Sequence, residues 1–213
     1  MRLQWNTVVH RGISWHDLEN EERRLIQKVK HDPDQGYFLI CEPTPTFTYG
    51  KSASPDDLLW SKTELARRGL EIIAADRGGK WTYHGPGQIV LFPIFDLAQG
   101  GYARTEIRRL VTGLRELTES FLDDLGISVD RRETPFGLYV ENQKLVSFGI
   151  AVHQGIASHG LALYYDGPDL SFLGIRSCGV TDERFTSLTQ LGKASGWEPT
   201  ALELARRLQK LTA

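Results

Sequence analysis

The chain contains two cysteines, and their surroundings in the sequence differ. Cys41 ends the apolar run of residues 37–40, which favours a place in the core. Cys178 follows a loop rich in glycine, proline and aspartate. Two cysteines are too few for a disulfide framework or a four-cysteine zinc site, so we expect two free thiols. A lone cysteine is more often inert than catalytic, but Cys178 is the candidate nucleophile.

A nucleophilic thiol needs a neighbour that favours its thiolate form, and lysine and histidine are the usual neighbours. The sequence offers Lys144, His84, His153 and His159, and their spacing does not choose among them. His153 falls on an expected strand, where a surface or hydrogen-bonded core role is the simpler interpretation. No two of these histidines have the i, i+4 spacing of a helical zinc site, so we expect no bound metal.

Glycines concentrate in two regions, residues 78–101 and 149–179. Residues 77–88 read RGGKWTYHGPGQ, in which paired glycines precede a basic and aromatic run and a Gly-Pro-Gly corner follows it. Glycine lets a ligand approach the backbone closely, but it is also the common residue of turns. The segment matches neither a phosphate-binding loop nor a dinucleotide fingerprint. It is therefore either a turn-rich connection or part of a ligand site.

Helices and strands alternate along the first part of the chain. Ser14 and Asp17 resemble a capping box that opens a helix ending before Asp32. Leu18, Leu25 and Val29 fall on one face of this helix. The pattern further predicts strands over 2–10, 37–42, 70–75 and 89–95, a short helix over 62–68, a glycine-rich loop over 76–88 and a long helix over 105–125.

From residue 136 the pattern changes to hairpins. Strands over 137–140 and 145–152 flank a polar turn at 141–144, and a second turn at 154–155 leads into a strand over 156–165. Thr200, followed by Glu203, indicates the cap of a last helix. We predict one α+β domain over residues 1–213, with a mixed, largely antiparallel sheet flanked by helices.

Composition excludes several function classes. The chain has 213 residues, with 25 Lys and Arg against 27 Asp and Glu and a formal charge of -2. It has no basic field for nucleic acid and no apolar run long enough to cross a membrane. The acidic residues 17, 19, 21 and 22 argue against a transit peptide, so we expect a cytoplasmic protein.

Four segments, in this order and spacing, closely resemble the lipoyl(octanoyl) transferases, which are octanoyl-(acyl carrier protein):protein N-octanoyltransferases. They are residues 77–88, residues 143–150 (QKLVSFGI), residues 158–163 (SHGLAL), and residues 178–180 (CGV) followed by 186–188 (TSL). The resemblance extends from Thr46 to Leu188, and its first motif is highly specific.

The resemblance implies that Cys178 is the acyl-thioester nucleophile and that Lys144 lowers its pKa and moves protons. It implies the fold of the lipoate- and biotin-protein ligases. The implied reaction carries an octanoyl or lipoyl group from acyl carrier protein to Cys178 and then to a lysine of a lipoyl domain, the first step of endogenous protein lipoylation. The implied substrate-binding residues are Arg77, Gly78, Gly79, Lys80, Trp81, Thr82, Tyr83, His84, Ser147, Phe148, Gly149, Gly160, Leu161 and Ala162.

The implied partners are octanoyl-acyl carrier protein as donor and apo lipoyl domains of 2-oxo-acid dehydrogenase complexes and of the glycine cleavage H protein as acceptors. No cofactor or ATP is needed, and we expect a monomer. Because such partners are typically acidic, a basic patch is expected near the loop, and Lys80, Arg104, Arg108 and Arg109 are the candidates. The alternative for Arg108 and Arg109 is a solvated helix face.

The sequence departs from the family pattern at Ser177, where proline usually precedes the cysteine. Two alternatives remain: an ATP-dependent lipoate-protein ligase of the same superfamily, and a non-catalytic acyl- or carrier-binding module. The ligase is disfavoured because residues 85–88 (GPGQ) stand where such ligases carry an Asp-containing loop. A retained Cys178 and Lys144 disfavour the binding module.

Overall fold

One large mixed sheet forms the centre of the molecule. The structure is a computed structural model that describes residues 3–77, 79–167, 170–176 and 183–212. The sheet has the order β1-β2-β6-β10-β9-β8-β7, with β11 beside β9. Its strands are β1 (Gln4–Ile13), β2 (Gln35–Pro43), β6 (Gln88–Asp96), β7 (Asp130–Glu133), β8 (Phe136–Val140), β9 (Gln143–His153), β10 (Ile156–Tyr164) and β11 (Arg184–Phe185).

The pairs β1–β2 and β9–β11 are parallel, and the other pairs of this sheet are antiparallel. The predicted α+β class with a mixed, largely antiparallel sheet is therefore confirmed. The predicted extent of the domain, residues 1–213, stays a prediction.

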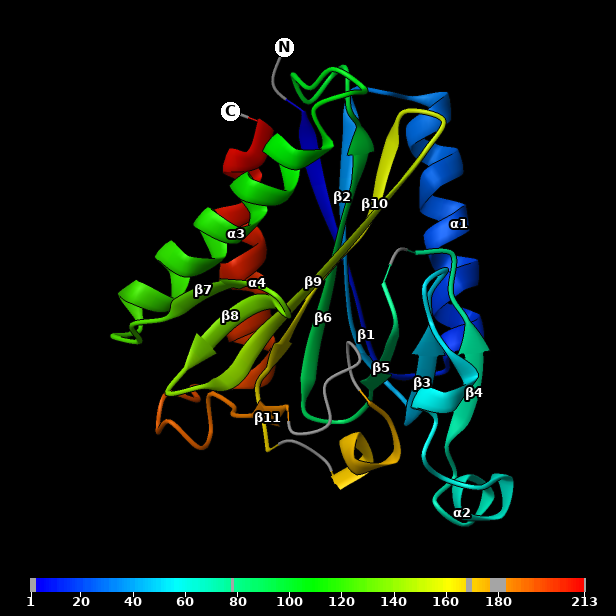
Figure 1. The fold of residues 1–213 in the computed structure, drawn as a ribbon. Helices are drawn as coiled ribbons and strands as arrows, with labels where there is room; N and C mark the ends of the chain where they lie inside the picture. Colours follow the sequence, from blue (N-terminus) through cyan, green and yellow to red (C-terminus); the bar gives the residue numbers. More distant parts are fainter. Residues whose placement is uncertain (1–2, 78, 168–169, 177–182, 213) are drawn as a thin grey trace.

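Helices cover both faces of the sheet (Figure 1). α3 (Ile107–Asp124) and α4 (Trp197–Leu208) pack on one face, and α1 (Trp15–His31) packs on the other. Strand β6 serves both layers: Ile89 and Leu91 belong to the α3–α4 core, while Val90 and Phe92 belong to the α1 core. The side chains alternate because successive strand residues point to opposite faces.

A second, three-stranded sheet lies on the α1 side (Figure 1). Its order is β4-β3-β5, with β3 (Thr46–Tyr49), β4 (Glu71–Ala74) and β5 (Trp81–His84). Three short helical segments accompany it: η1 (Pro55–Asp57), α2 (Lys62–Arg67) and η2 (Leu170–Gly174). Phe47, Tyr83, Phe172 and Phe185 form its aromatic core, in which the rings of Phe172 and Phe185 stack 3.8 Å apart.

Local signals predicted several boundaries correctly. Ser14 caps α1 by accepting the backbone N–H of Asp17, and α1 ends at His31. The two hairpin turns lie at residues 141–142 and 154–155, where Glu141, Asn142 and Gln154 have positive φ angles. None of the helices in the described part of the chain is long and apolar enough to span a membrane.

Three local predictions were wrong. Residues 81–84 form strand β5, although 76–88 was expected to be a loop, because Trp81 and Tyr83 enter the aromatic core. The turn at 141–144 is shorter than expected, since Gln143 and Lys144 already belong to β9. The last helix begins at Trp197 with Gly196 as its cap, so the Thr200 hydroxyl bonds back to the Gly196 carbonyl inside the first turn.

Candidate functional site

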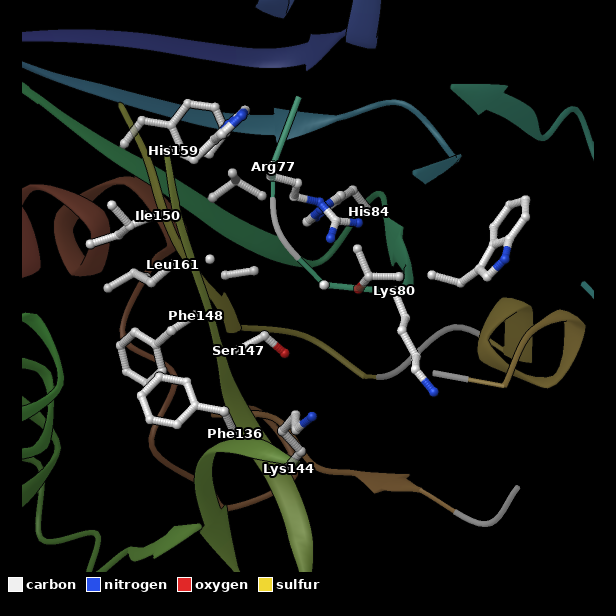
Figure 2. A pocket seen from close by; sticks show the side chains of 18 of the residues that line it. Arg77, Lys80, His84, Phe136, Lys144, Ser147, Phe148, Ile150, His159 and Leu161 are labelled. Carbon is white, nitrogen blue, oxygen red and sulfur yellow. The ribbon is translucent and has the colours of Figure 1, made fainter. Parts of the chain in front are cut away.

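A cavity of about 200 Å³ lies between the large sheet and the segment that leads into β5. Figure 2 shows the side chains that surround it. The predicted site residues that line it are Arg77, Gly79, Lys80, Trp81, Thr82, His84, Lys144, Ser147, Phe148, Gly149, Gly160, Leu161 and Ala162. The other lining residues are Trp15, Val90, Phe92, Phe136, Ile150 and His159.

Among the predicted residues that the structure describes, Tyr83 does not line the cavity. Tyr83 is 1% exposed and packs against Phe47 and Phe172 in the core of the small sheet, on the other side of β5. Cys178 and Gly78 lie outside the described residues, as does Ser177. The strand alternation of 81–84 separates Tyr83 from Thr82 and His84.

The other lining residues had weaker signals in the sequence. His159 was a candidate thiol neighbour, and Val90 and Phe92 share one face of β6. The two faces of this strand could be predicted from the sequence, but not which of them borders a cavity. Trp15 stands at the start of α1, and its ring stacks on His84 with centroids 4.7 Å apart.

The β9–β10 hairpin forms the floor of the cavity. Ser147 pairs with Ala162, Phe148 with Leu161, and Gly149 with Gly160. A Cβ atom at Gly149 would meet no atom within 4 Å, so this glycine opens space. A Cβ atom at Gly160 would lie 2.3 Å from the carbonyl oxygen of Leu91, so that glycine permits close strand packing.

Lys144 stands at one end of this floor in a buried ion pair. Its Nζ atom lies 2.5 Å from Oε1 of Glu183, and the two side chains are 2% and 4% exposed. The Tyr139 hydroxyl donates to the same Glu183 oxygen at 2.7 Å. Glu183 was not predicted from the sequence. It comes close to Lys144 because Phe185 of β11, two residues later, pairs with Lys144 of β9. A lysine within a buried strand signals that a carboxylate is needed, but not which one.

The opposite end holds a carboxyl and two imidazoles. Ile150 lies six positions after Lys144 on β9 and pairs with His159. His159 is therefore roughly 20 Å from Lys144 along the strand direction. The backbone N–H of His159 donates to Glu22 Oε1 at 3.1 Å, and its Nδ1 lies 3.4 Å from that oxygen. Figure 2 shows His159 and Lys144 on opposite sides of Ser147.

Burial decides the charges at this second end. It raises the pKa of Glu22 to about 7. Burial, with the nearby charge of Arg77 as a second cause, lowers the pKa of His159 to about 4 and that of His84 to about 3. Both imidazoles are therefore neutral at pH 7. His84 Nδ1 lies 3.0 Å from the Gln88 side-chain oxygen.

The expected basic patch is only partly assembled at the cavity. Lys80 lines the cavity, whereas Arg104, Arg108 and Arg109 do not. The Arg104 guanidinium lies beside Gly155 in the hairpin turn, and Arg109 pairs with Glu106. Arg108 and Arg109 lie in the first turn of α3, where Arg109 also donates to the Gly101 carbonyl at 3.2 Å.

Cys41 is fully buried on β2, and burial raises the pKa of its thiol well above the ordinary value. Its prediction as a core residue is confirmed. Among the described residues, no group of three or more His, Cys, Asp or Glu side chains is arranged to hold a metal ion. The wall thus combines an apolar floor with one buried ammonium, an arrangement suited to an acyl chain with a reactive carbonyl at the lysine end.

The chain is similar to known proteins of one family over most of its length. The model of the lipoyl protein ligase A/B catalytic domain matches residues 20–210. An octanoyltransferase of Chloroflexus aurantiacus is 42% identical over 192 residues, which cover 88% of this chain and 82% of that protein.

Two solved structures share the fold. Lipoate-protein ligase A bound with ATP has a TM-score of 0.72 and 13% identity, covering 99% of this chain and 85% of its own. A bipartite lipoate protein ligase from Thermoplasma acidophilum, studied with its E2 lipoyl domain, has a TM-score of 0.68 and 13% identity, covering 99% of this chain and 84% of its own.

Proposed function

This chain belongs to the family of the lipoyl protein ligase A/B catalytic domain and is an octanoyltransferase of protein lipoylation; we propose that it works through a thioester on Cys178. The donor is octanoyl-acyl carrier protein, and a lipoyl group is transferred in the same way. The acceptor is a specific lysine of a lipoyl domain. The observation that carries the proposal is the buried ammonium of Lys144 at the end of an apolar cavity.

In the first step, the Cys178 thiolate attacks the carbonyl carbon of the donor thioester. The bond between that carbon and the carrier sulfur breaks, and the acyl group stays on Cys178. Lys144 favours the thiolate while it is an ammonium and then gives its proton to the departing carrier thiolate. One thioester replaces another, so the step needs no activated phosphate.

In the second step, the neutral amine of the acceptor lysine attacks the thioester on Cys178. An amide bond forms, Cys178 leaves as a thiolate, and the surplus proton of the new amide nitrogen goes to Lys144. The enzyme returns to its starting protonation. Amide formation is the favourable step, because an amide is more stable than a thioester.

The acyl chain lies along the floor formed by Phe148, Gly149, Ile150 and Leu161 in this proposal. Apolar side chains and an open glycine position support that placement. His84 and His159 are neutral at pH 7, so they place no charge beside the hydrocarbon. The cavity thus offers an apolar floor for the tail and the Lys144 ammonium for the head, and Arg77 also lines its wall.

The acceptors in this proposal are apo lipoyl domains of 2-oxo-acid dehydrogenase complexes and the glycine cleavage H protein, and the reaction takes place in the cytoplasm. The enzyme acts as a monomer. Lys80 at the cavity wall supports an acidic partner. No cofactor takes part in either step.

An intact-mass experiment tests the proposal. The wild-type protein, Cys178→Ala and Cys41→Ala are each incubated with octanoyl-acyl carrier protein, and the intact mass of each is measured by mass spectrometry. We expect an octanoyl adduct on the wild type and on Cys41→Ala, and none on Cys178→Ala. An apo lipoyl domain then discharges the adduct and gains the octanoyl mass.

Two other outcomes decide against it. Modification of the lipoyl domain only with free octanoate and ATP, without an enzyme adduct, would identify an ATP-dependent ligase. Binding of the carrier protein without any acyl transfer would identify a binding module. Either result removes the nucleophilic role of Cys178.

A further inference from the structure

We propose that Glu183 is a positioning residue for the transfer reaction, which holds Lys144 in place and in its protonated form. This inference rests on the proposed function, because it assigns Lys144 a proton to give and take. It concerns a residue five positions after Cys178 that touches the lysine rather than the substrate.

Burial creates the need for such a residue. The Lys144 side chain is 2% exposed, so its ammonium has lost nearly all contact with bulk water. A buried ammonium without a partner tends to lose its proton, because a low-dielectric surrounding disfavours the charged form. The Tyr139 ring, 5.4 Å from Nζ, supplies a weak cation–π contact. Oε1 of Glu183, at 2.5 Å, supplies the full opposite charge.

The backbone fixes where this charge lies. Phe185 of β11 pairs in parallel with Lys144 of β9, and the Thr186 N–H donates to the Lys144 carbonyl at 3.0 Å. The Phe185 ring is stacked on Phe172. Glu183 therefore stands directly before a strand that is anchored to the lysine's own strand.

Side-chain contacts fix the carboxylate further. The Tyr139 hydroxyl donates to Oε1 from β8, and the Arg132 guanidinium of β7 lies over the Tyr139 ring, 4.3 Å from its centroid. Oε2 is buried and has no hydrogen-bond partner among the described residues. Lys144 is the one cation within ion-pair distance of Glu183 in that part of the chain.

The consequence for catalysis concerns the proton shared by Cys178 and Lys144. Transfer of the thiol proton to the neutral amine gives a thiolate and an ammonium. A carboxylate 2.5 Å from the amine stabilises the ammonium, because the Coulomb attraction of two opposite charges is strong at contact. Glu183 therefore favours the reactive pair in the first step and strengthens Lys144 as the proton acceptor in the second.

Thiol alkylation as a function of pH tests this role. Wild type, Glu183→Gln and Glu183→Asp are treated with iodoacetamide between pH 6 and 9, and modification of Cys178 is followed by peptide mass. Cys41 is fully buried and serves as the internal unreactive thiol. Glu203→Gln, which removes an exposed partner of Arg206, is the matched control for the loss of a carboxylate.

We expect Glu183→Gln to lower the alkylation rate of Cys178 at pH 7 about tenfold and to move the pH profile upward. Glu183→Asp keeps the carboxylate but shortens the side chain by one methylene group. We expect its alkylation rate at Cys178 to be about threefold lower than that of the wild type. Glu203→Gln should match the wild type. Thermal melting of each variant reports whether it is folded.

An unchanged or faster reaction of folded Glu183→Gln would overturn the inference. If Glu183→Gln does not fold, Glu183→Asp decides: a wild-type rate overturns the inference, and a slower rate with an upward-shifted profile supports it. Absence of an octanoyl adduct on the wild type would instead refute the proposed function, so the two failures are distinguishable.

Discussion

The two ends of the cavity bury the same kind of group and treat it differently. At one end, the Glu183 carboxylate meets the Lys144 ammonium at 2.5 Å. At the other, Glu22 accepts the backbone N–H of His159 and lies beside its neutral ring, and no cation is within ion-pair distance among the described lysines and arginines. Burial is nearly complete in both places.

The two carboxyls are buried to a similar depth, and the difference lies in their partners. Without a cation in contact, burial raises the pKa of Glu22 to about 7. With Lys144 in contact, Glu183 forms an ion pair. The acyl chemistry is thus proposed at the end with the buried ion pair, and the hydrocarbon is proposed to lie toward the end with the two neutral imidazoles.

Removing the lysine should have the largest effect. Lys144→Met leaves Glu183 buried without its cation, and breaking such a pair from one side costs about 3–5 kcal/mol. We expect the free energy of unfolding, measured with urea, to fall by that amount, and transfer activity to be lost.

The double variant Lys144→Met/Glu183→Leu separates stability from chemistry. Replacing both partners by apolar side chains is often neutral for stability, so the fold should recover while activity stays absent. Equal destabilisation of the single and double variants would show that the unpaired Glu183 carboxylate is not the cause of the lost stability in Lys144→Met.

Glu22→Gln tests the opposite end through pH. The unfolded chain releases the Glu22 proton near pH 4.5, whereas the folded protein keeps it up to about pH 7. Folding therefore binds a proton in this window, and the stability contributed by Glu22 falls as pH rises through it. Above pH 7, Glu22→Gln should exceed the wild type by up to about 3 kcal/mol, and below pH 4 the two should agree.

Urea unfolding at pH 4, 6 and 8 measures this difference. His84 and His159 act in the opposite sense between pH 3 and 6.5, because burial lowers their pKa values, but they are present in both proteins. Glu19, Arg23 and His153 also act on the Glu22 carboxyl and remain unchanged. A constant difference across the three pH values would contradict the predicted proton uptake.

Gly149→Val probes the floor between the ends and should affect stability least. The added side chain enters open space on a strand, so we expect a change below about 1 kcal/mol. It should slow octanoyl adduct formation about tenfold while a butyryl donor still reacts, as intact mass can show. Gly160→Ala is the contrast, because its Cβ would push strand β10 away from the Leu91 carbonyl and lower the melting temperature.

Prediction from sequence succeeded where the signal was local. Ser14 and Asp17 lie within one helical turn of each other. Both hairpin turns lie in short polar segments between apolar strand patterns within residues 137–165. It failed where a residue's role depends on distant packing. Thr200 carried a cap signal, but the packing of Trp197 started the helix earlier, and Tyr83 belongs to a ligand-site motif yet packs into the core.

The candidate site was predictable in part for the same reason. The motif residues that line the cavity came from a resemblance, and their neighbours on one strand face follow from a period of two. Glu183 and Glu22 could not be predicted in either way, because each reaches the site from an element that is far from it in the sequence. The partner of a buried group is set by strand pairing and helix docking, which leave no local pattern.

The pairing of β11 with β9 also has a consequence for protein synthesis. Lys144 is made well before Glu183, and the β9–β10 hairpin is complete before β11 leaves the ribosome. A domain generally folds as a unit once its chain has been synthesised. A nascent chain that stops short of residue 183 therefore carries the lysine without its carboxylate, and the ion pair can form only in the last stage of translation.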